Sequence, residues 1–142
     1  MYKKILVALE NSPADESMLP QITHLARRLG SELLLLHVAD GWAARSFDQL
    51  KLAESEEIKN DRAYLEKTAA QLRSENLVVS TRLAMGSPPA EILKVAEAEH
   101  CNLIAMTSHG HRFFGDIFHG STITQVRHHT HIPIFLVRAE RK

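Results

Sequence analysis

The sequence predicts an α/β fold, with one open five-stranded parallel sheet and helices on both of its faces, in the order β-α-β-α-β-α-β-α-β. Two observations support this prediction. Five short apolar runs lie along the chain, and four stretches with helical spacing or helix-start residues separate them. Strict alternation of this kind requires right-handed crossovers, which place helices on both faces of a parallel sheet. The 142 residues fit a single domain spanning 1–142.

The first strand and helix meet at a turn that is rich in helix-start residues. The strand is the uninterrupted apolar run 5–9, which suits burial on both faces. Ser12 then reads as an N-cap, with Pro13 as the first helical residue and Asp15 completing a capping-box-like pair. Apolar residues continue at helical spacing until Gly30, which predicts the end of the helix.

The middle of the chain predicts two strands around a long helix. Residues 33–38 form the second strand, a loop follows over 39–48, and a helix runs from about 49 to 75. Its inward residues are Leu52, Ile58, Leu65, Ala69 and Leu72, and its charges read as a solvated face. Residues 77–83 form the third strand, whose partial alternation indicates one half-exposed face.

The last third of the chain repeats the pattern. Ser87 is the N-cap of a helix with a proline at its first position. A buried strand over 102–106 follows, then a glycine-containing loop over 107–118 and a short helix over 120–128. The apolar run 132–137 is the fifth strand.

Composition excludes several classes of protein. Lys plus Arg equals Asp plus Glu, 17 each, so no basic footprint predicts binding to nucleic acid or to an anionic membrane. The chain has one cysteine, Cys101, and therefore no intramolecular disulfide. No stretch approaches the roughly 18 apolar residues of a membrane span, and the apolar run behind the N-terminus is too short for a signal peptide. These features predict a cytoplasmic protein that does not associate with membranes.

The segment between the fourth strand and the last helix carries the features of a phosphate site. Ligands of parallel sheets bind beyond the carboxyl ends of the strands. Gly110 follows the fourth strand, and Gly120, Ser121 and Thr122 open a helix whose free N–H groups and positive dipole end can face a phosphate. Arg112 can add a charge-assisted contact to outer phosphates. No Gly-Lys-Ser/Thr of a Walker loop occurs in the chain.

The whole chain resembles a universal stress protein. In the nucleotide-binding branch of that family the phosphate loop reads Gly-x-x-Gly, nine residues, then Gly-Ser/Thr, and here Thr107-Ser108-His109-Gly110 is followed by nine residues and Gly120-Ser121. The other matching segments are Tyr2-Lys3-Lys4-Ile5-Leu6-Val7, His37-Val38, Gly86-Ser87-Pro88 and Ile132-Pro133-Ile134-Phe135-Leu136-Val137. Three positions depart from the pattern: Thr107 replaces a glycine, Glu10 stands where an aspartate near the ribose is usual, and Ala8 stands where proline is common.

The resemblance implies a Rossmann-like fold of the adenine nucleotide alpha hydrolase-like type that binds ATP or another adenine nucleotide such as AMP. It implies contacts to the adenosine part from Ala8, Leu9, Glu10 and Val38. It implies that Met106, Thr107, Gly110, Gly120, Ser121 and Thr122 surround the phosphates. Mg²⁺ can accompany the nucleotide, with Asp116 and Glu10 as the nearby carboxylates.

Three classes of function remain open. The first is a regulatory stress protein that binds ATP and is read by an unknown protein partner, without rapid catalysis, because no general base is fixed beside the phosphate loop. The second is a slow ATP-hydrolysing or adenylate-transferring enzyme on the same fold. The third is a nucleotide-free dimerising module, which Thr107 would favour if it closed the loop.

The last strand predicts a homodimer. Pro133 belongs at a sheet edge or a strand end, and the residues 134–137 that follow are all apolar. A bare apolar edge invites uncontrolled pairing, and a two-fold contact between two copies would close it. The family resemblance implies the same dimer.

The histidines and the cysteine allow less specific readings. His128, His129 and His131 suit the C-terminal end of a helix better than a metal site. His37 is expected to be hydrogen-bonded in place, whereas His109 is expected either to contact phosphate or to be exposed. The cysteine is expected to be packed rather than reactive.

Overall fold

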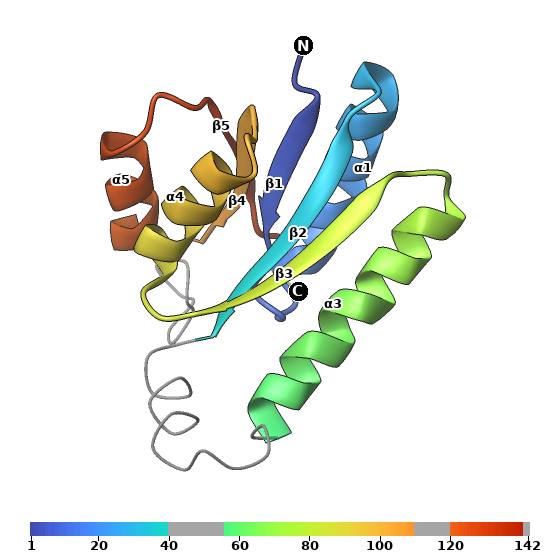
Figure 1. The fold of residues 1–142 in the computed structure, drawn as a ribbon, viewed down its shortest axis with the longest axis horizontal. Coiled ribbons are helices and arrows are strands. Elements are labelled where there is room, and N and C mark those ends of the chain that lie inside the picture. Colours follow the sequence, from blue (N-terminus) through green and yellow to red (C-terminus); the bar gives the residue numbers. More distant parts are fainter. Residues whose placement is uncertain (40–55, 110–119, 141–142) are drawn as a thin grey trace.

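A computed structural model describes residues 1–39, 56–109 and 120–140. Its centre is a parallel sheet of five strands in the order β3-β2-β1-β4-β5 (Figure 1). The strands are β1 (Lys4–Ala8), β2 (Glu32–Ala39), β3 (Val79–Met85), β4 (Leu103–Ser108) and β5 (Ile134–Arg138), and all four neighbouring pairs are parallel. The predicted α/β class and the alternation of elements are therefore confirmed.

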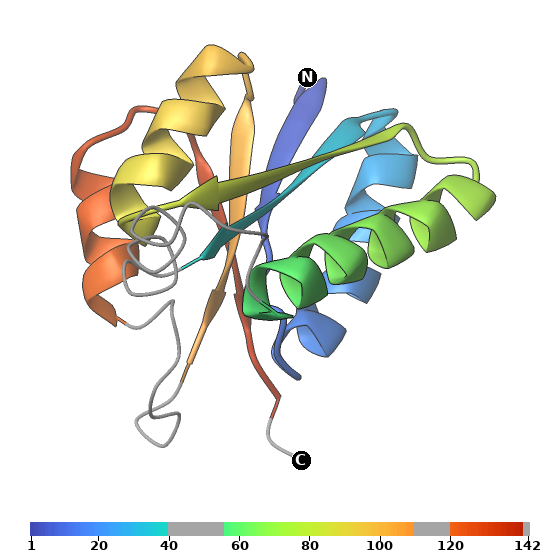
Figure 2. The ribbon, with the colours of Figure 1, turned by 60° about the horizontal axis from the view of Figure 1, so that its bottom comes forward.

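Helices cover both faces of this sheet. They are α1 (Asp15–Leu29), α3 (Glu56–Ser74), α4 (Pro88–Ala98) and α5 (Gly120–His128). Figure 2 shows α1 and α3 on one face and α4 and α5 on the other. Within the described ranges, no helix has the length and apolar character needed to cross a bilayer.

The strand order fixes where a ligand site belongs. The chain builds outward from β1 through β2 to β3, and then crosses to the other side of β1 to add β4 and β5. β1 and β4 are therefore neighbours at the point where the direction of winding reverses. In open α/β sheets this switch point opens a crevice beyond the carboxyl ends of the strands. The residues that follow β1 and β4 therefore border the expected ligand site.

Alternating side chains divide the core into two layers. Ile5 and Val7 of β1, and Leu9 directly after it, pack in the layer beneath α1 and α3, which we call the α1/α3 layer. Leu6 and Ala8 pack on the opposite face, in the α4/α5 layer. Residues 5–9 are fully buried, so the central strand reads as continuously apolar because both of its faces are covered.

The predicted start of the first helix is wrong. α1 begins at Asp15, and its N-cap position is occupied by Ala14, which has no side-chain cap. The Ser12 hydroxyl accepts the Ala14 N–H at 3.2 Å, and the Ser12 carbonyl accepts the Asp15 N–H at 3.0 Å. Ser12 and Pro13 therefore form a tight turn ahead of the helix, because the Ser12 side chain satisfies a turn instead of the first helical N–H groups.

The later elements shift by a few residues. Ser87 is the N-cap of α4 as predicted and Pro88 is its first residue, although the Ser87 hydroxyl makes no cap hydrogen bond. β4 continues to Ser108, so the predicted loop over 107–118 begins too early. The predicted helix over 49–75 is confirmed for 56–74, and its first residues, with Leu52, lie outside the described residues.

Gly30 ends α1 in the left-handed conformation, with φ +68°, and its N–H bonds to the Ala26 carbonyl. A Cβ built there meets no atom within 4 Å, so backbone strain alone would oppose a side chain. We expect Gly30→Ala to lower the free energy of unfolding by about 1 kcal/mol. Urea denaturation measures this loss. Gly30→Asn should lose less, because asparagine adopts the left-handed region more readily, and an alanine variant as stable as the parent would contradict the strain argument.

Candidate functional site

The turn over residues 9–12, which we call the β1 turn, occupies the switch point. It leaves the carboxyl end of β1, and Asn11 has a left-handed backbone with φ +57°. The Asp15 carboxylate accepts the Glu10 N–H at 2.9 Å through Oδ1 and the Asn11 N–H at 2.9 Å through Oδ2. The first residue of α1 therefore holds two backbone N–H groups of the turn that precedes the helix.

Tyr64 of α3 holds the same carboxylate from the other side. Its hydroxyl donates to Asp15 Oδ2 at 2.6 Å. Burial raises the pKa of Asp15, and the bonds from Glu10, Tyr64 and the neighbouring N–H groups only partly oppose that rise. Burial also raises the pKa of Tyr64, with a further contribution from the Asp15 charge, so the phenol remains a neutral donor.

A second polar chain joins β2, α3 and the β1 turn. One ring nitrogen of His37, Nδ1, lies 2.9 Å from the Leu9 carbonyl oxygen, and the other, Nε2, lies 3.2 Å from Asp61 Oδ2. The Asn11 side-chain amide donates to Asp61 Oδ1 at 2.8 Å. The side chains of His37 and Asp61 are only 3% and 8% exposed, so this ion-pair geometry lies inside the protein.

A third contact bridges the two strands of the switch point. His109, just past β4, places its Nε2 2.6 Å from Glu10 Oε2. Both side chains are almost fully buried, with 3% and 1% exposure. Because a carboxylate accepts, the Nε2–H of His109 donates in this bond. The end of β1 is therefore tied to the end of β4 by one strong charge-assisted contact.

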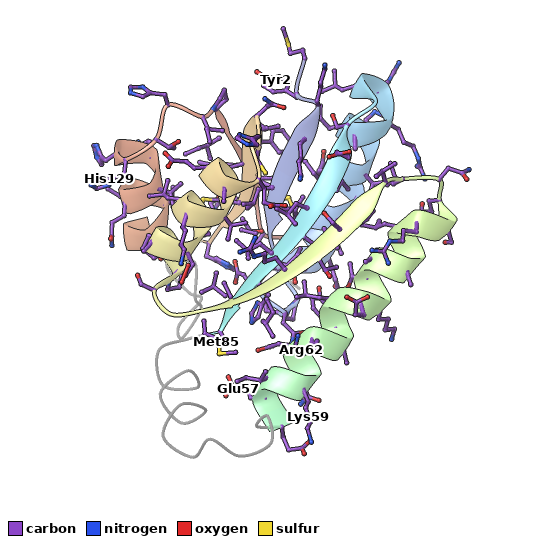
Figure 3. The ribbon with its side chains drawn as sticks, viewed as in Figure 1. Tyr2, Glu57, Lys59, Arg62, Met85 and His129 are labelled. Carbon is purple, nitrogen blue, oxygen red and sulfur yellow. The ribbon has the colours of Figure 1, made fainter. Side chains whose placement is uncertain are left out.

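A polar hollow of about 410 Å³ opens beside these contacts on the α3 side. Its lining residues are Glu10, Asn11, His37, Glu57, Asn60 and Asp61. Figure 3 shows Glu57 in the first turn of α3, at the same end of the molecule as Met85, the last residue of β3. The hollow therefore lies at the carboxyl edge of the sheet.

The residues predicted to contact adenosine divide between the two faces. Ala8 and Val38 lie near the carboxyl ends of the neighbouring strands β1 and β2 in the α4/α5 layer, and both are fully buried. Met106 of β4, which was predicted to lie near the phosphates, is fully buried in the same layer. The Leu9 side chain belongs to the α1/α3 layer, and Glu10 is 5% exposed. The structure thus brings three of the predicted residues together on the face that also carries α5.

The residues predicted to surround the phosphates lie at two places. Thr107 lies inside β4, in register with Val137 and fully buried, so its backbone has the ordinary extended conformation. Gly120 and Ser121 form the start of α5, and Thr122 behind them is buried. In Figure 2 the chain enters α5 at the end of the molecule where β4 finishes. Gly110 and Arg112 lie outside the described residues.

The remaining polar predictions have mixed outcomes. His37 is hydrogen-bonded in place, as expected. His109 is buried against Glu10, so the expectation of exposure is wrong. Cys101 is packed, and burial raises the pKa of its thiol to about 11, which keeps it unreactive at neutral pH. Over the described ranges, no three His, Cys, Asp or Glu side chains are grouped to hold a metal ion.

Asp61 and Tyr64 are the site residues that the sequence reasoning missed. The charges of the long helix were expected to form a solvated face, yet Asp61 is 6% exposed. A signal was available, because Asp61 stands three residues after Ile58 and four before Leu65, on the apolar stripe that faces the core. A carboxylate on that stripe requires a buried partner.

Comparisons with known proteins agree on one family. The universal stress protein family model matches residues 1–138. A universal stress protein from Methanocaldococcus jannaschii is 28% identical, and the match covers 97% of this chain and 96% of that one. Its solved structure superposes with a TM-score of 0.78 over 100% of this chain and 99% of the other.

Two further solved structures share the fold at lower identity. One is a universal stress protein from Archaeoglobus fulgidus in complex with dAMP, at 20% identity and a TM-score of 0.68, covering 96% of this chain and 98% of that one. The other is a universal stress protein in complex with cAMP, at 12% identity and a TM-score of 0.69, covering 98% of each chain. At these identities the likeness shows the fold alone.

The Thr107 hydroxyl is buried and has no hydrogen-bond partner among the residues that the structure describes. Valine has the same branched shape without the polar atom. We therefore expect Thr107→Val to raise the free energy of unfolding of the nucleotide-free protein by about 1 kcal/mol, since a buried hydroxyl without a partner is costly. Urea denaturation measures the change. Thr107→Ser, which keeps the hydroxyl and removes the methyl group, is the control and should destabilise. A valine variant less stable than the parent would show that the hydroxyl has a partner.

Proposed function

The chain belongs to the universal stress protein family, and we propose that it binds an adenine nucleotide, with ATP as the first candidate, at the carboxyl edge of the sheet. The observation that supports this most is the β1 turn at the switch point. Its backbone is fixed by Asp15, His37 and Tyr64 before any ligand arrives. A prepared site loses little conformational entropy on binding.

The placement of α5 supports a phosphate site at the same edge. The helix begins at Gly120, and helix starts carry free N–H groups and partial positive charge. Ala8, Val38 and Met106 lie on the same face of the sheet as α5. We assign the adenosine part to Ala8 and Val38, together with Leu9 and Glu10 of the β1 turn. We assign the phosphates to the end of β4, at Met106 and Thr107, and to the start of α5, at Gly120, Ser121 and Thr122, with Gly110 and Arg112 beside them.

Relatives support the class of ligand. The two complexes named above hold dAMP and cAMP, which share adenine and a phosphate. ATP extends this common part by two phosphates, and in our proposal Arg112 contacts these outer phosphates. AMP is the alternative ligand that retains only the common part.

A dedicated magnesium site does not fit the described residues. Mg²⁺ prefers carboxylate and water oxygens in an octahedral arrangement. The Glu10 carboxylate faces His109, and no group of three suitable ligands lies within the described ranges. In our proposal a magnesium ion enters with ATP and remains on its phosphate oxygens.

We propose a regulatory role without rapid turnover, in the cytoplasm, where a protein partner reads the nucleotide state. The titratable groups at the β1 turn are engaged with one another: His109 with Glu10, and His37 with Asp61. A general base must instead lie within reach of a reacting group. A slow hydrolase is the competing function, and release of phosphate or pyrophosphate from ATP would favour it.

Gly120→Val tests the nucleotide site. A branched side chain at the helix start would block the approach of a phosphate to the backbone, so we expect ATP binding to be lost while the fold remains. Titration calorimetry of the parent and the variant measures this. Thr124→Val is the matched control, because Thr124 is an exposed residue of the same helix and also becomes valine. Unchanged ATP affinity in a folded Gly120→Val protein would rule out this phosphate site.

We also propose that two copies pair through β5. The two edge strands differ in character: β3 carries Ser80, Thr81 and Arg82, whereas β5 is mostly apolar. Leu136 of β5 is 49% exposed, which is costly for a large apolar side chain in a bare edge. A two-fold pairing of β5 would satisfy its backbone groups and cover this side chain.

Leu136→Lys tests the dimer without damage to the core. Phe135 packs against the α1/α3 layer, so its replacement would destabilise the monomer as well. We expect light scattering at micromolar concentration to give a dimer mass for the parent and a monomer mass for Leu136→Lys. Leu29→Lys, at a residue 39% exposed on α1, should remain dimeric. A monomeric parent would refute the pairing.

A further inference from the structure

We propose that Asp61 and Tyr64 of α3 are positioning residues for the nucleotide, which hold the β1 turn in its binding shape without touching the ligand. This inference rests on the proposed function. The two residues are three apart on one helix, so they project from the same face. Asp61 accepts directly from the Asn11 side chain and reaches the Leu9 carbonyl through His37, whereas Tyr64 reaches the turn through Asp15.

Two chains of hydrogen bonds, which we call relays, lead from α3 to the β1 turn. The first relay fixes the backbone N–H groups of the turn. Tyr64 donates to Asp15 Oδ2, the oxygen that also accepts the Asn11 N–H. The bond orients the carboxylate so that its other oxygen meets the Glu10 N–H. Without the phenol, the carboxylate can rotate or recruit water. The direction of the Glu10 and Asn11 peptide groups then becomes less well defined.

The second relay fixes the carbonyl side of the same turn. His37 Nδ1 must carry a proton, because the Leu9 carbonyl can only accept. His37 Nε2 faces the Asp61 carboxylate, which already accepts from the Asn11 amide. His37 therefore lies between the Leu9 carbonyl and the Asp61 carboxylate, with one ring nitrogen on each. The imidazole ring thus joins α3 to the carbonyl of Leu9.

The two relays lie on the opposite face of the sheet from the assigned nucleotide. Leu9 and Leu65 belong to the α1/α3 layer, whereas Ala8, Val38 and Met106 belong to the α4/α5 layer. Asp61 and Tyr64 therefore act through the backbone of the turn.

Apolar side chains also hold α3 against the sheet. Ile58, Leu65, Ala69 and Leu72 bury the helix against the sheet. Burial raises the pKa of Asp15 in spite of the bonds it accepts, so the ionised carboxylate is a cost to the fold. A buried ionised group that costs stability and orders a ligand-binding turn is explained by binding more readily than by folding.

Tyr64→Phe is the first test, because it keeps the ring and removes only the donor. We expect the affinity for ATP and for AMP to fall about tenfold, which corresponds to about 1.4 kcal/mol. The melting temperature should change little. Tyr2→Phe, at the chain's only other tyrosine, is the control and should bind like the parent. Figure 3 shows Tyr2 at the end of the molecule opposite to Glu57 and Met85.

Asp61→Asn is the second test. Asp61 uses one carboxylate oxygen for Asn11 and the other for His37, whereas an asparagine side chain has a single oxygen and an NH2 group in place of the second. One of the two contacts should therefore break, and the affinity for ATP and for AMP should fall at least about fivefold. Glu66→Gln is the matched control, because it makes the same charge change on the same helix at an exposed carboxylate that accepts from Thr81. Both controls should retain the parent affinity.

Two readouts in the nucleotide-free protein separate positioning from a general structural effect. The amide signals of Glu10 and Asn11 should shift and exchange faster with solvent in Tyr64→Phe. The Asp15 carboxyl titration, followed by carbon NMR, should move to higher pH, because the Tyr64 hydrogen bond lowers its pKa. Neither change is expected in Tyr2→Phe.

The outcomes are distinct. Weaker nucleotide binding by folded Tyr64→Phe and Asp61→Asn, with perturbed turn amides, supports the inference. Parent-like affinity in either folded variant overturns it. If the parent itself binds neither ATP nor AMP, the proposed function fails, and the amide and titration readouts then decide the positioning alone: unchanged signals in Tyr64→Phe overturn it, and the expected shifts support it.

Discussion

The structure of the switch point depends on the hydrogen bonds that the Asp15 carboxylate accepts. This carboxylate accepts from the backbone of Glu10 and Asn11 and from the hydroxyl of Tyr64, and so joins the end of β1, the start of α1 and the middle of α3. The turn needs such support because Asn11 has a left-handed backbone, which is less favourable than the right-handed one even for asparagine, the residue after glycine that adopts it most readily. Without the carboxylate, the buried N–H group of Glu10 would lack a partner, and the N–H group of Asn11 would lose its partner in a partly buried place.

The molecule combines an apolar sheet with an ionic edge. The centre of the sheet is covered on both faces and contributes most of the stability through burial. At the carboxyl edge, by contrast, two acid–histidine pairs and the Asp15–Tyr64 bond are buried together. Buried ion pairs often contribute little net stability, because desolvation offsets their attraction. Their concentration where the winding reverses is therefore explained best by the binding of a ligand there.

Short-range patterns predicted the parts of the fold that depend on local physics. The apolar runs gave all five strands within about two residues, because burial on both faces leaves a continuous signature. Gly30 predicted the end of α1 correctly, because the helix ends in a left-handed conformation that glycine adopts without strain. The prediction of Ser12 as the N-cap of α1 was wrong, because a serine hydroxyl makes similar local hydrogen bonds in a turn and in a helix cap.

The site was less predictable, because its contacts join residues far apart in the chain. Glu10 meets His109 across 99 positions and Tyr64 meets Asp15 across 49. Family resemblance indicated the β1 turn and the start of α5, but no motif marks the helix that holds the turn in place. Asp61 could be recognised only by its position on an apolar stripe, and its partners could not be named before the topology was known.

Direct identification of bound ligand tests whether the carboxyl edge of the sheet holds an adenine nucleotide. The purified protein would be denatured, and the released small molecules separated and identified by mass spectrometry, before and after incubation with millimolar ATP. We expect an adenine nucleotide in near-stoichiometric amount after incubation, and a measurable fraction already present on purification. Protein that releases no adenine nucleotide in either case would contradict nucleotide binding at this edge and favour a nucleotide-free dimerising module.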